Sequence, residues 1–152
     1  METSLNARDR DPVQLLAALV GATFLLVGIL GFIPGITSNL YGGLDFAGHA
    51  SNAKILHVFQ TSWLHNIVHL AFGISGLMLA RTWAGARTYL IGGGVIYLAL
   101  WLYGLIVGPD SSANFVPLNT ADDWLHFVLG TGMIGLGFVT TRERRTTARA
   151  AA

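Results

Sequence analysis

Residues 66–73 read Asn66-Ile67-Val68-His69-Leu70-Ala71-Phe72-Gly73, and residues 123–130 read Asp123-Trp124-Leu125-His126-Phe127-Val128-Leu129-Gly130. The two stretches lie 57 positions apart. They share an amide or acid, two apolar residues, a histidine, three apolar residues and a glycine. Each lies in a long apolar segment, where a polar side chain is costly unless it has a partner. The repetition predicts two copies of one helical unit.

The composition is typical of a membrane protein. The 152 residues suit one domain, and 53% are hydrophobic whereas 11% are charged, against about 25% charged in soluble domains. The 19 glycines suit closely packed membrane helices. The net charge of +1 and the absence of cysteine give no indication of nucleic-acid binding and exclude disulfides, thiolate metal sites and a cysteine nucleophile.

The hydropathy pattern predicts an all-α protein, a four-helix transmembrane bundle with an internal two-helix duplication. Each apolar segment has about the 20 residues needed to cross a bilayer, although the first and third segments share little sequence. The four predicted spans are Val13–Ile33, Trp63–Ala80, Thr88–Val107 and Trp124–Thr141. The domain divisions are then a leader at 1–12, a four-span membrane domain at 13–141 and a basic tail at 142–152, which we expect to be irregular.

Lys and Arg are distributed unequally between the two sides of the predicted bundle. One side holds eight arginines: Arg8, Arg10, Arg81, Arg87, Arg142, Arg144, Arg145 and Arg149. The other side holds only Lys54, with several aspartates. Because basic residues stay in the cytoplasm, we predict that both termini are cytoplasmic and that the protein lies in the bacterial inner membrane.

The two outer connections carry local signals of their own. In the first, residues 55–60 are predicted to form an amphipathic helical approach to the second span. In the second, Thr120-Ala121-Asp122-Asp123 is similar to a capping box, with the Thr120 hydroxyl on an early backbone N–H.

The polar and small residues of the second and fourth spans each share one helix face at 100° per residue. On the second span this face holds Ser62, His65, Asn66, His69, Gly73 and Gly76. On the fourth it holds Asn119, Asp122, Asp123, His126, Gly130, Met133 and Gly137. The two stripes run in the same direction, and we expect them to face one another near the outer surface, related by a pseudo-twofold axis along the membrane normal.

The first interpretation of these stripes is structural. Small residues let membrane helices approach closely, and a polar side chain then forms a hydrogen bond across the contact, for about 0.6–2 kcal/mol. Asn66, Gly73 and Gly130 would form this polar core, with no cofactor.

The second interpretation is a ligand site, because polar residues inside a membrane mark functional sites by default. His65 and His69 are four residues apart and can hold one metal ion, with Asp123 and His126 completing the set; Zn or Cu suits imidazole ligands. Alternatively, His69 and His126 could ligate haem b, with space provided by Gly73 and Gly130.

The sequence also resembles a known family. The stretches Phe59–Leu70 and Val116–His126 are similar to the signature motifs of small four-span bacterial membrane proteins described only as a domain of unknown function. The resemblance covers roughly residues 13–140 and implies fold and location but no activity. In that family the position of Asp123 is often Asn, so the carboxylate here adds to the case for a polar or metal site.

These observations together favour a non-enzymatic role. We expect an integral membrane protein that is structural or binds a partner as an accessory subunit, in contact with the lipid bilayer and with a homo-oligomer or membrane-protein partner. The alternative is a metal- or haem-binding redox protein that uses the histidines near the outer face. The third possibility is transport of a small solute by an oligomer, which four spans without a deeply placed charge support less well.

Overall fold

The computed structural model describes residues 10–150, with side chains described for residues 10–140. The chain is mainly helical, with three very short strands. The helices in this part of the chain are α1 (Pro12–Leu30), α2 (Leu40–Gly43), α3 (Trp63–Leu79), α4 (Trp83–Val107) and α5 (Thr120–Ala150). Four of them match the predicted spans, so the sequence located these helices to within a few residues at most ends. Arg8 and the four C-terminal arginines fall outside the residues whose side chains are described.

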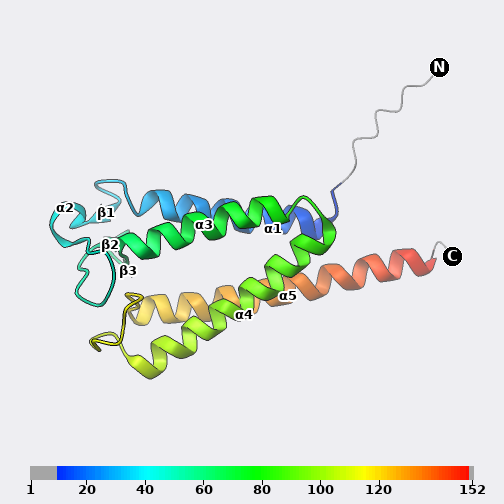
Figure 1. Ribbon diagram of the computed structural model, residues 1–152. Helices are drawn as coiled ribbons and strands as arrows, with labels where there is room; N and C mark the ends of the chain where they lie inside the picture. The colour runs from blue at the N-terminus through cyan, green and yellow to red at the C-terminus, as the bar shows by residue number, and fades with distance from the viewer. Residues whose placement is uncertain (1–9, 151–152) are drawn as a thin grey trace, which may run out of the picture.

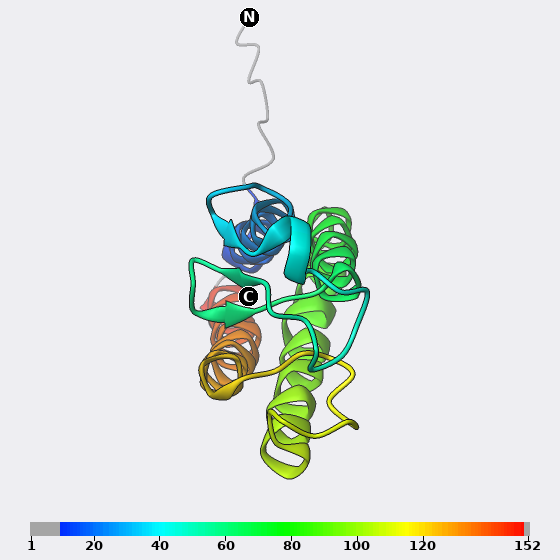
Figure 2. The same cartoon turned by 90° about the vertical axis from the view of Figure 1, so that its left-hand side faces the viewer.

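Two helix pairs make up the bundle. The most extensive contacts are those between α1 and α3 and those between α4 and α5, whereas α3 and α5 touch very little. Figure 2 shows α1 and α5 on one side of the end-on view, with α3 and α4 on the other. The sequence predicted that the polar stripes of α3 and α5 face one another, and this prediction was wrong. Each stripe faces the other helix of its own pair.

The short turn at 80–82 joins the two pairs. Thr82 caps α4 by accepting a hydrogen bond from the backbone N–H of Gly85, at 3.1 Å. α1 begins and α5 ends at the same end of the molecule as this turn, and the long connections lie at the opposite end (Figure 1). The backbone of the basic tail is helical as far as Ala150, so the expectation of an irregular tail was wrong up to this residue.

A small sheet covers the other end of the bundle, where the sequence predicted a helical approach. β1 (Thr37–Ser38), β2 (Lys54–Ile55) and β3 (Phe59–Gln60) form an antiparallel sheet in the order β1-β2-β3, with Lys54 opposite Gln60. Leu56 and His57 both have positive φ, at 52° and 63°, which is the geometry of a tight hairpin turn. The amphipathic spacing of residues 55–60 thus belongs to a hairpin, not to a helix.

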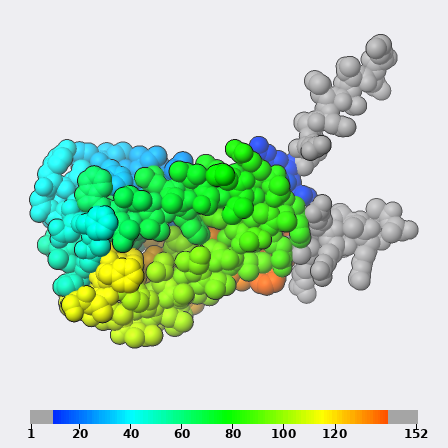
Figure 3. Space-filling model, in the orientation of Figure 1, coloured from blue at the N-terminus to red at the C-terminus, as the bar shows by residue number. Residues whose placement is uncertain are grey.

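The end of the bundle that carries the sheet is closed by two segments that meet. The Gly48 N–H donates to the Phe115 carbonyl at 2.8 Å, and Figure 3 shows the segment between α1 and α3 beside the segment between α4 and α5. The Asn119 side-chain amide donates to the Val58 carbonyl at 2.8 Å. These contacts fix the hairpin against the start of α5.

α5 is capped one residue earlier than predicted. The side-chain oxygen of Asn119 accepts hydrogen bonds from the backbone N–H groups of Ala121 and Asp122, and Asp122 accepts one in return from the Asn119 N–H. This reciprocal arrangement is a capping box. Asn119 is therefore the cap, and the prediction of the Thr120 hydroxyl was wrong.

The two helix pairs are repeats of one unit. Gly21, Phe24 and Leu25 of α1 and its C-cap Gly31 correspond to Gly94, Tyr97, Leu98 and Gly104 of α4, all shifted by 73 positions. α3 and α5 correspond with a shift of 57, because Asn66 follows Gly31 by 35 positions whereas Asp123 follows Gly104 by only 19. Contacts described below recur at these equivalent positions, which supports the duplication that the first and third spans hardly showed.

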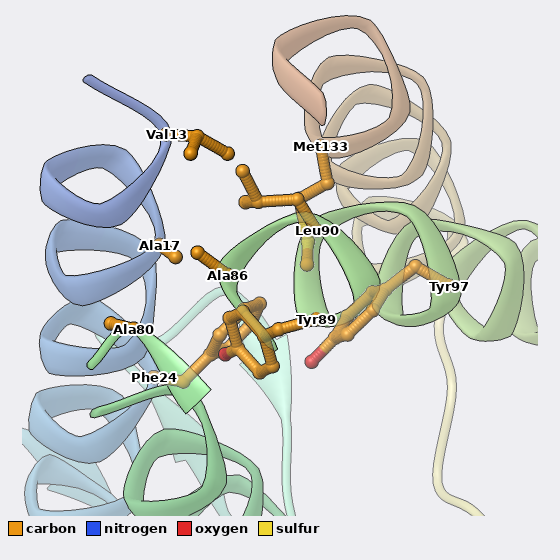
Figure 4. Close-up of a cluster of buried hydrophobic side chains, with 9 residues drawn as sticks. All are labelled: Val13, Ala17, Phe24, Ala80, Ala86, Tyr89, Leu90, Tyr97 and Met133. Carbon is orange, nitrogen blue, oxygen red and sulfur yellow. The ribbon is translucent and has the colours of Figure 1, made fainter. Parts of the chain in front are cut away.

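Helices α1 and α4 are long and apolar enough to cross a membrane, by length and composition. α3 is apolar but has 17 residues. The core between the pairs is a cluster of buried side chains drawn in Figure 4, among them Phe24 of α1 with Tyr89 and Tyr97 of α4.

Candidate functional site

The first residue of each repeated motif lies against a glycine of the partner helix. The Asn66 amide donates to the Gly31 carbonyl at 3.0 Å, and the Asn66 oxygen accepts from the Thr61 hydroxyl. Asp123 occupies the equivalent place, where a Cβ on Gly104 would overlap its carboxylate. One oxygen of Asp123 is buried without a hydrogen-bond partner, and burial raises the pKa of this carboxyl, which precedes the predicted fourth span. Both residues thus act in helix packing.

The last residue of each motif permits close helix contact. A Cβ on Gly73 would lie 2.5 Å from the backbone nitrogen of Leu25 and 2.8 Å from the Gly21 carbonyl oxygen. A Cβ on Gly130 would lie 2.9 Å from the Gly94 carbonyl oxygen. Backbone therefore approaches backbone at equivalent points in both pairs, as small residues allow.

The two motif histidines reach the centre of the molecule. The Phe24 and Tyr97 rings, which are equivalent in the repeat, stack at 5.1 Å where the two pairs meet. His69 packs edge-on against Phe24 at 5.6 Å, and His126 packs edge-on against Tyr97 at 5.1 Å. His69 and His126 therefore pack against the two rings of one stack, an arrangement that the sequence did not predict.

His65 and His69 bond to each other. Their Nε2 atoms are 3.0 Å apart, so one Nε2 donates a proton and the other accepts it. The Nδ1 of His65 is buried and has no partner. A bare acceptor there is less costly than an unpaired N–H, which favours His65 as the donor to His69.

Two cavities adjoin these histidines. The first, of about 140 Å³, lies between α3 and α4 beneath Phe115-Val116-Pro117. The second, of about 130 Å³, lies between α1 and α5 beneath the β2–β3 hairpin. Four side chains line both cavities: His65, His69, Tyr97 and His126.

Asp122 contributes a carboxylate to the second cavity. One of its oxygens accepts hydrogen bonds from the backbone N–H groups of Gln60 and Asn119, at 3.1 and 3.0 Å. Burial raises the pKa of Asp122 to about 7, against those two hydrogen bonds. Both its neutral and charged forms are then populated near neutral pH. Asp122 takes the place in the second repeat that His65 takes in the first.

The structure therefore assembles three of the predicted metal ligands around the cavities and leaves one out. His65, His69 and His126 line both, whereas Asp123 lines neither. Asp122, which the sequence predicted to be part of a helix cap, lines the second cavity, and Tyr97 lines both. The 57-residue shift between the repeats, applied to His65, would have identified Asp122 as a site residue. Identifying Tyr97 required the correspondence between α1 and α4, which the sequence hardly showed.

The fit of the two cofactor classes differs. Among the described residues no group of three or more His, Cys, Asp or Glu side chains could hold a metal ion as they stand, although the His65–His69 pair presents two nitrogens to one point. A cavity of about 150 Å³ holds a benzene-sized molecule, so a porphyrin is far larger than either cavity.

Comparison with known proteins gives one match. A family model described as a domain of unknown function (DUF4383) matches residues 14–139. No curated protein and no solved structure matches the chain.

Proposed function

The chain belongs to the DUF4383 family of unknown function, and we propose that it is a four-span protein of the bacterial inner membrane with a non-enzymatic, structural or partner-binding role. Both termini are cytoplasmic in this proposal. The observation that carries it is the apolar exterior of all four long helices.

Large apolar side chains are exposed along each of these helices. Examples are Leu19 on α1, Met78 on α3, Ile106 on α4 and Val128 on α5, which are 64%, 58%, 82% and 62% exposed. Soluble monomers rarely expose contiguous apolar surface of this extent, whereas lipid accommodates it. The 17 residues of α3 span about 25 Å at 1.5 Å per residue, and its outer end adjoins the small sheet.

The structural part of the role rests on the two motif positions already described. Asn66 and Asp123 pack against glycines of the partner helices, and Gly73 and Gly130 bring backbones together. These contacts hold the two helices of each pair together. The apolar exterior leaves room for a second copy or another membrane protein in the plane of the bilayer.

Cysteine labelling tests the membrane placement, because the chain has no native cysteine. Ala50→Cys and Ser112→Cys lie on exposed positions of the outer connections, and Ala84→Cys lies exposed beside the inner turn. In intact bacterial cells, a membrane-impermeant maleimide should label the first two variants, and Ala84→Cys only after permeabilisation. Labelling of Ala84→Cys in intact cells, or recovery of the protein in the soluble fraction, would contradict the proposal.

A metal-binding redox role is the second candidate, favoured by the His65–His69 geometry. Nitrogen ligands of tetrahedral zinc, at 2.0–2.1 Å from the metal, stand roughly 3.3 Å apart, close to the 3.0 Å between the two Nε2 atoms. His126 would supply the third ligand, and Asp123 could join only after moving from Gly104.

Purified protein should then take up Zn or Cu in a fixed ratio. His69→Ala should abolish this uptake. His57→Ala serves as the control, because His57 is exposed at the hairpin tip. Equal uptake by both variants would exclude the His65–His69 pair as the metal site, and a Soret band would identify haem instead.

A further inference from the structure

The two cavities are equivalent parts of the repeat. Val68 and Leu100 of the first cavity correspond to Leu125 and Val27 of the second, by the shifts of 57 and 73. Each is covered on its outer side by its own connection, the first by residues 115–117 and the second by the hairpin. The same enclosed space has therefore been kept twice, although the covering segments differ in length and structure.

Helix packing does not account for the polar groups that these cavities share. Asn66, Asp123 and the motif glycines make the contacts between helices, as shown above. By contrast, neither the Tyr97 hydroxyl nor the His126 ring has a hydrogen-bond partner within residues 10–140, and the Nδ1 of His126 is buried. His126 is 3% exposed. Buried polar groups are normally paired, so an unpaired one beside a cavity points to a ligand.

The size and lining of the cavities define the ligand. Each volume is close to that of a cavity that binds benzene, about 150 Å³. Apart from the histidines, Tyr97 and Asp122, the walls are almost wholly apolar, and no arginine or lysine lines them. Val68 and Leu125 are 51% and 37% exposed, so each cavity has one wall on the apolar exterior of the bundle.

We propose that the paired cavities bind a neutral, ring-sized apolar molecule that carries a hydroxyl or carbonyl oxygen, and that Tyr97 and His126 hold this oxygen. The ring lies among the apolar side chains. The oxygen meets a hydroxyl that donates and accepts, and an imidazole that does the same. The site goes beyond the structural role proposed above and does not depend on a metal.

The test is a titration of the protein in lipid nanodiscs with 4-fluorophenol, followed by ¹⁹F NMR and corrected with empty nanodiscs. Wild-type protein should show saturable binding of two probes per chain. Fluorobenzene, which lacks the oxygen, should bind about tenfold more weakly. Binding equal to that of empty nanodiscs, or equal affinity for the two probes, would overturn the proposal.

Two tyrosines of α4 provide a matched pair of variants. Tyr97→Phe and Tyr89→Phe each remove one hydroxyl from a side chain that is 4% exposed, but only Tyr97 lines the cavities. Tyr97→Phe should weaken 4-fluorophenol binding about five- to tenfold, and Tyr89→Phe should leave it unchanged. Equal effects would remove Tyr97 from the site.

Filling one cavity gives an independent measurement. Val68→Phe enlarges a half-exposed side chain beside the first cavity and should reduce the stoichiometry from two probes to one. Ile106→Phe makes the same type of change at an 82% exposed position outside both cavities and should leave two probes bound. Two bound probes in Val68→Phe would contradict the assignment of the first cavity.

Discussion

Replacing Gly73 with alanine is expected to lower the free energy of unfolding by about 2–3 kcal/mol, the upper part of the range for overpacking a well-packed interior. The added methyl group would lie 2.5 Å from the Leu25 nitrogen and 2.8 Å from the Gly21 carbonyl oxygen. Both neighbours are backbone atoms, so no side chain can rotate away. The helices α1 and α3 must move apart, and this movement also loses the Asn66–Gly31 hydrogen bond.

Thermal or denaturant unfolding in detergent measures this effect, with Gly132→Ala as the control. Nothing lies within 4 Å of a Cβ at Gly132, and alanine favours a helix over glycine by up to about 1 kcal/mol. Gly132→Ala should therefore leave stability unchanged or raise it. If both variants unfold alike, the close approach of α1 and α3 is not what Gly73 provides.

Each motif begins with a different residue, Asn66 in the first repeat and Asp123 in the second. Placing the other repeat's residue at each position should lower the free energy of unfolding for Asn66→Asp and raise it for Asp123→Asn. Asn66→Asp replaces the amide that donates to the Gly31 carbonyl with a buried carboxylate that faces this oxygen. A buried charge left without a partner costs about 3–5 kcal/mol. We expect a loss of this size at neutral pH, and part of it should be recovered as the pH falls, because a protonated carboxyl can donate to Gly31.

Asp123→Asn should instead stabilise the protein, by about 1–2 kcal/mol. One oxygen of Asp123 is buried without a partner, which costs about 1–3 kcal/mol. An amide can donate to a backbone carbonyl of α4 as Asn66 does to α1. Asp110→Asn is the control, because Asp110 is exposed in the outer connection. A loss of stability in Asp123→Asn would show that the carboxylate has a partner or role of its own.

The sequence predicted the helices well because their apolar length and caps are local properties. α3 begins at Trp63, as predicted, directly after its cap Ser62. α4 begins at Trp83 after its cap Thr82, earlier than the predicted start at Thr88. The hairpin at 54–60 was missed because its polar residues, Lys54, His57 and Gln60, recur at every third position, a spacing that suits a short amphipathic helix. Only the positive φ values at Leu56 and His57 decide between the two, and neither residue is typical of a tight turn.

The candidate site was predicted only in part, for a reason of packing. Helical periodicity shows which residues share a face, but not which helix lies opposite that face. The stripes of α3 and α5 were therefore expected to meet each other, whereas they meet α1 and α4. Asp123 consequently packs against Gly104, and Asp122, one residue earlier, lines the cavity with His126.

The pairing of neighbouring helices has a consequence for how the protein is made. α1 contacts mainly α3, and α4 contacts mainly α5, so each half completes its own packing from residues that leave the ribosome one after the other. Domains and motifs with such local contacts form quickly and early in synthesis. The first half can thus fold before α5 exists, and the last step is the meeting of the halves at Phe24 and Tyr97. This step also encloses His69 and His126, so the site is complete only when the whole chain has been synthesised.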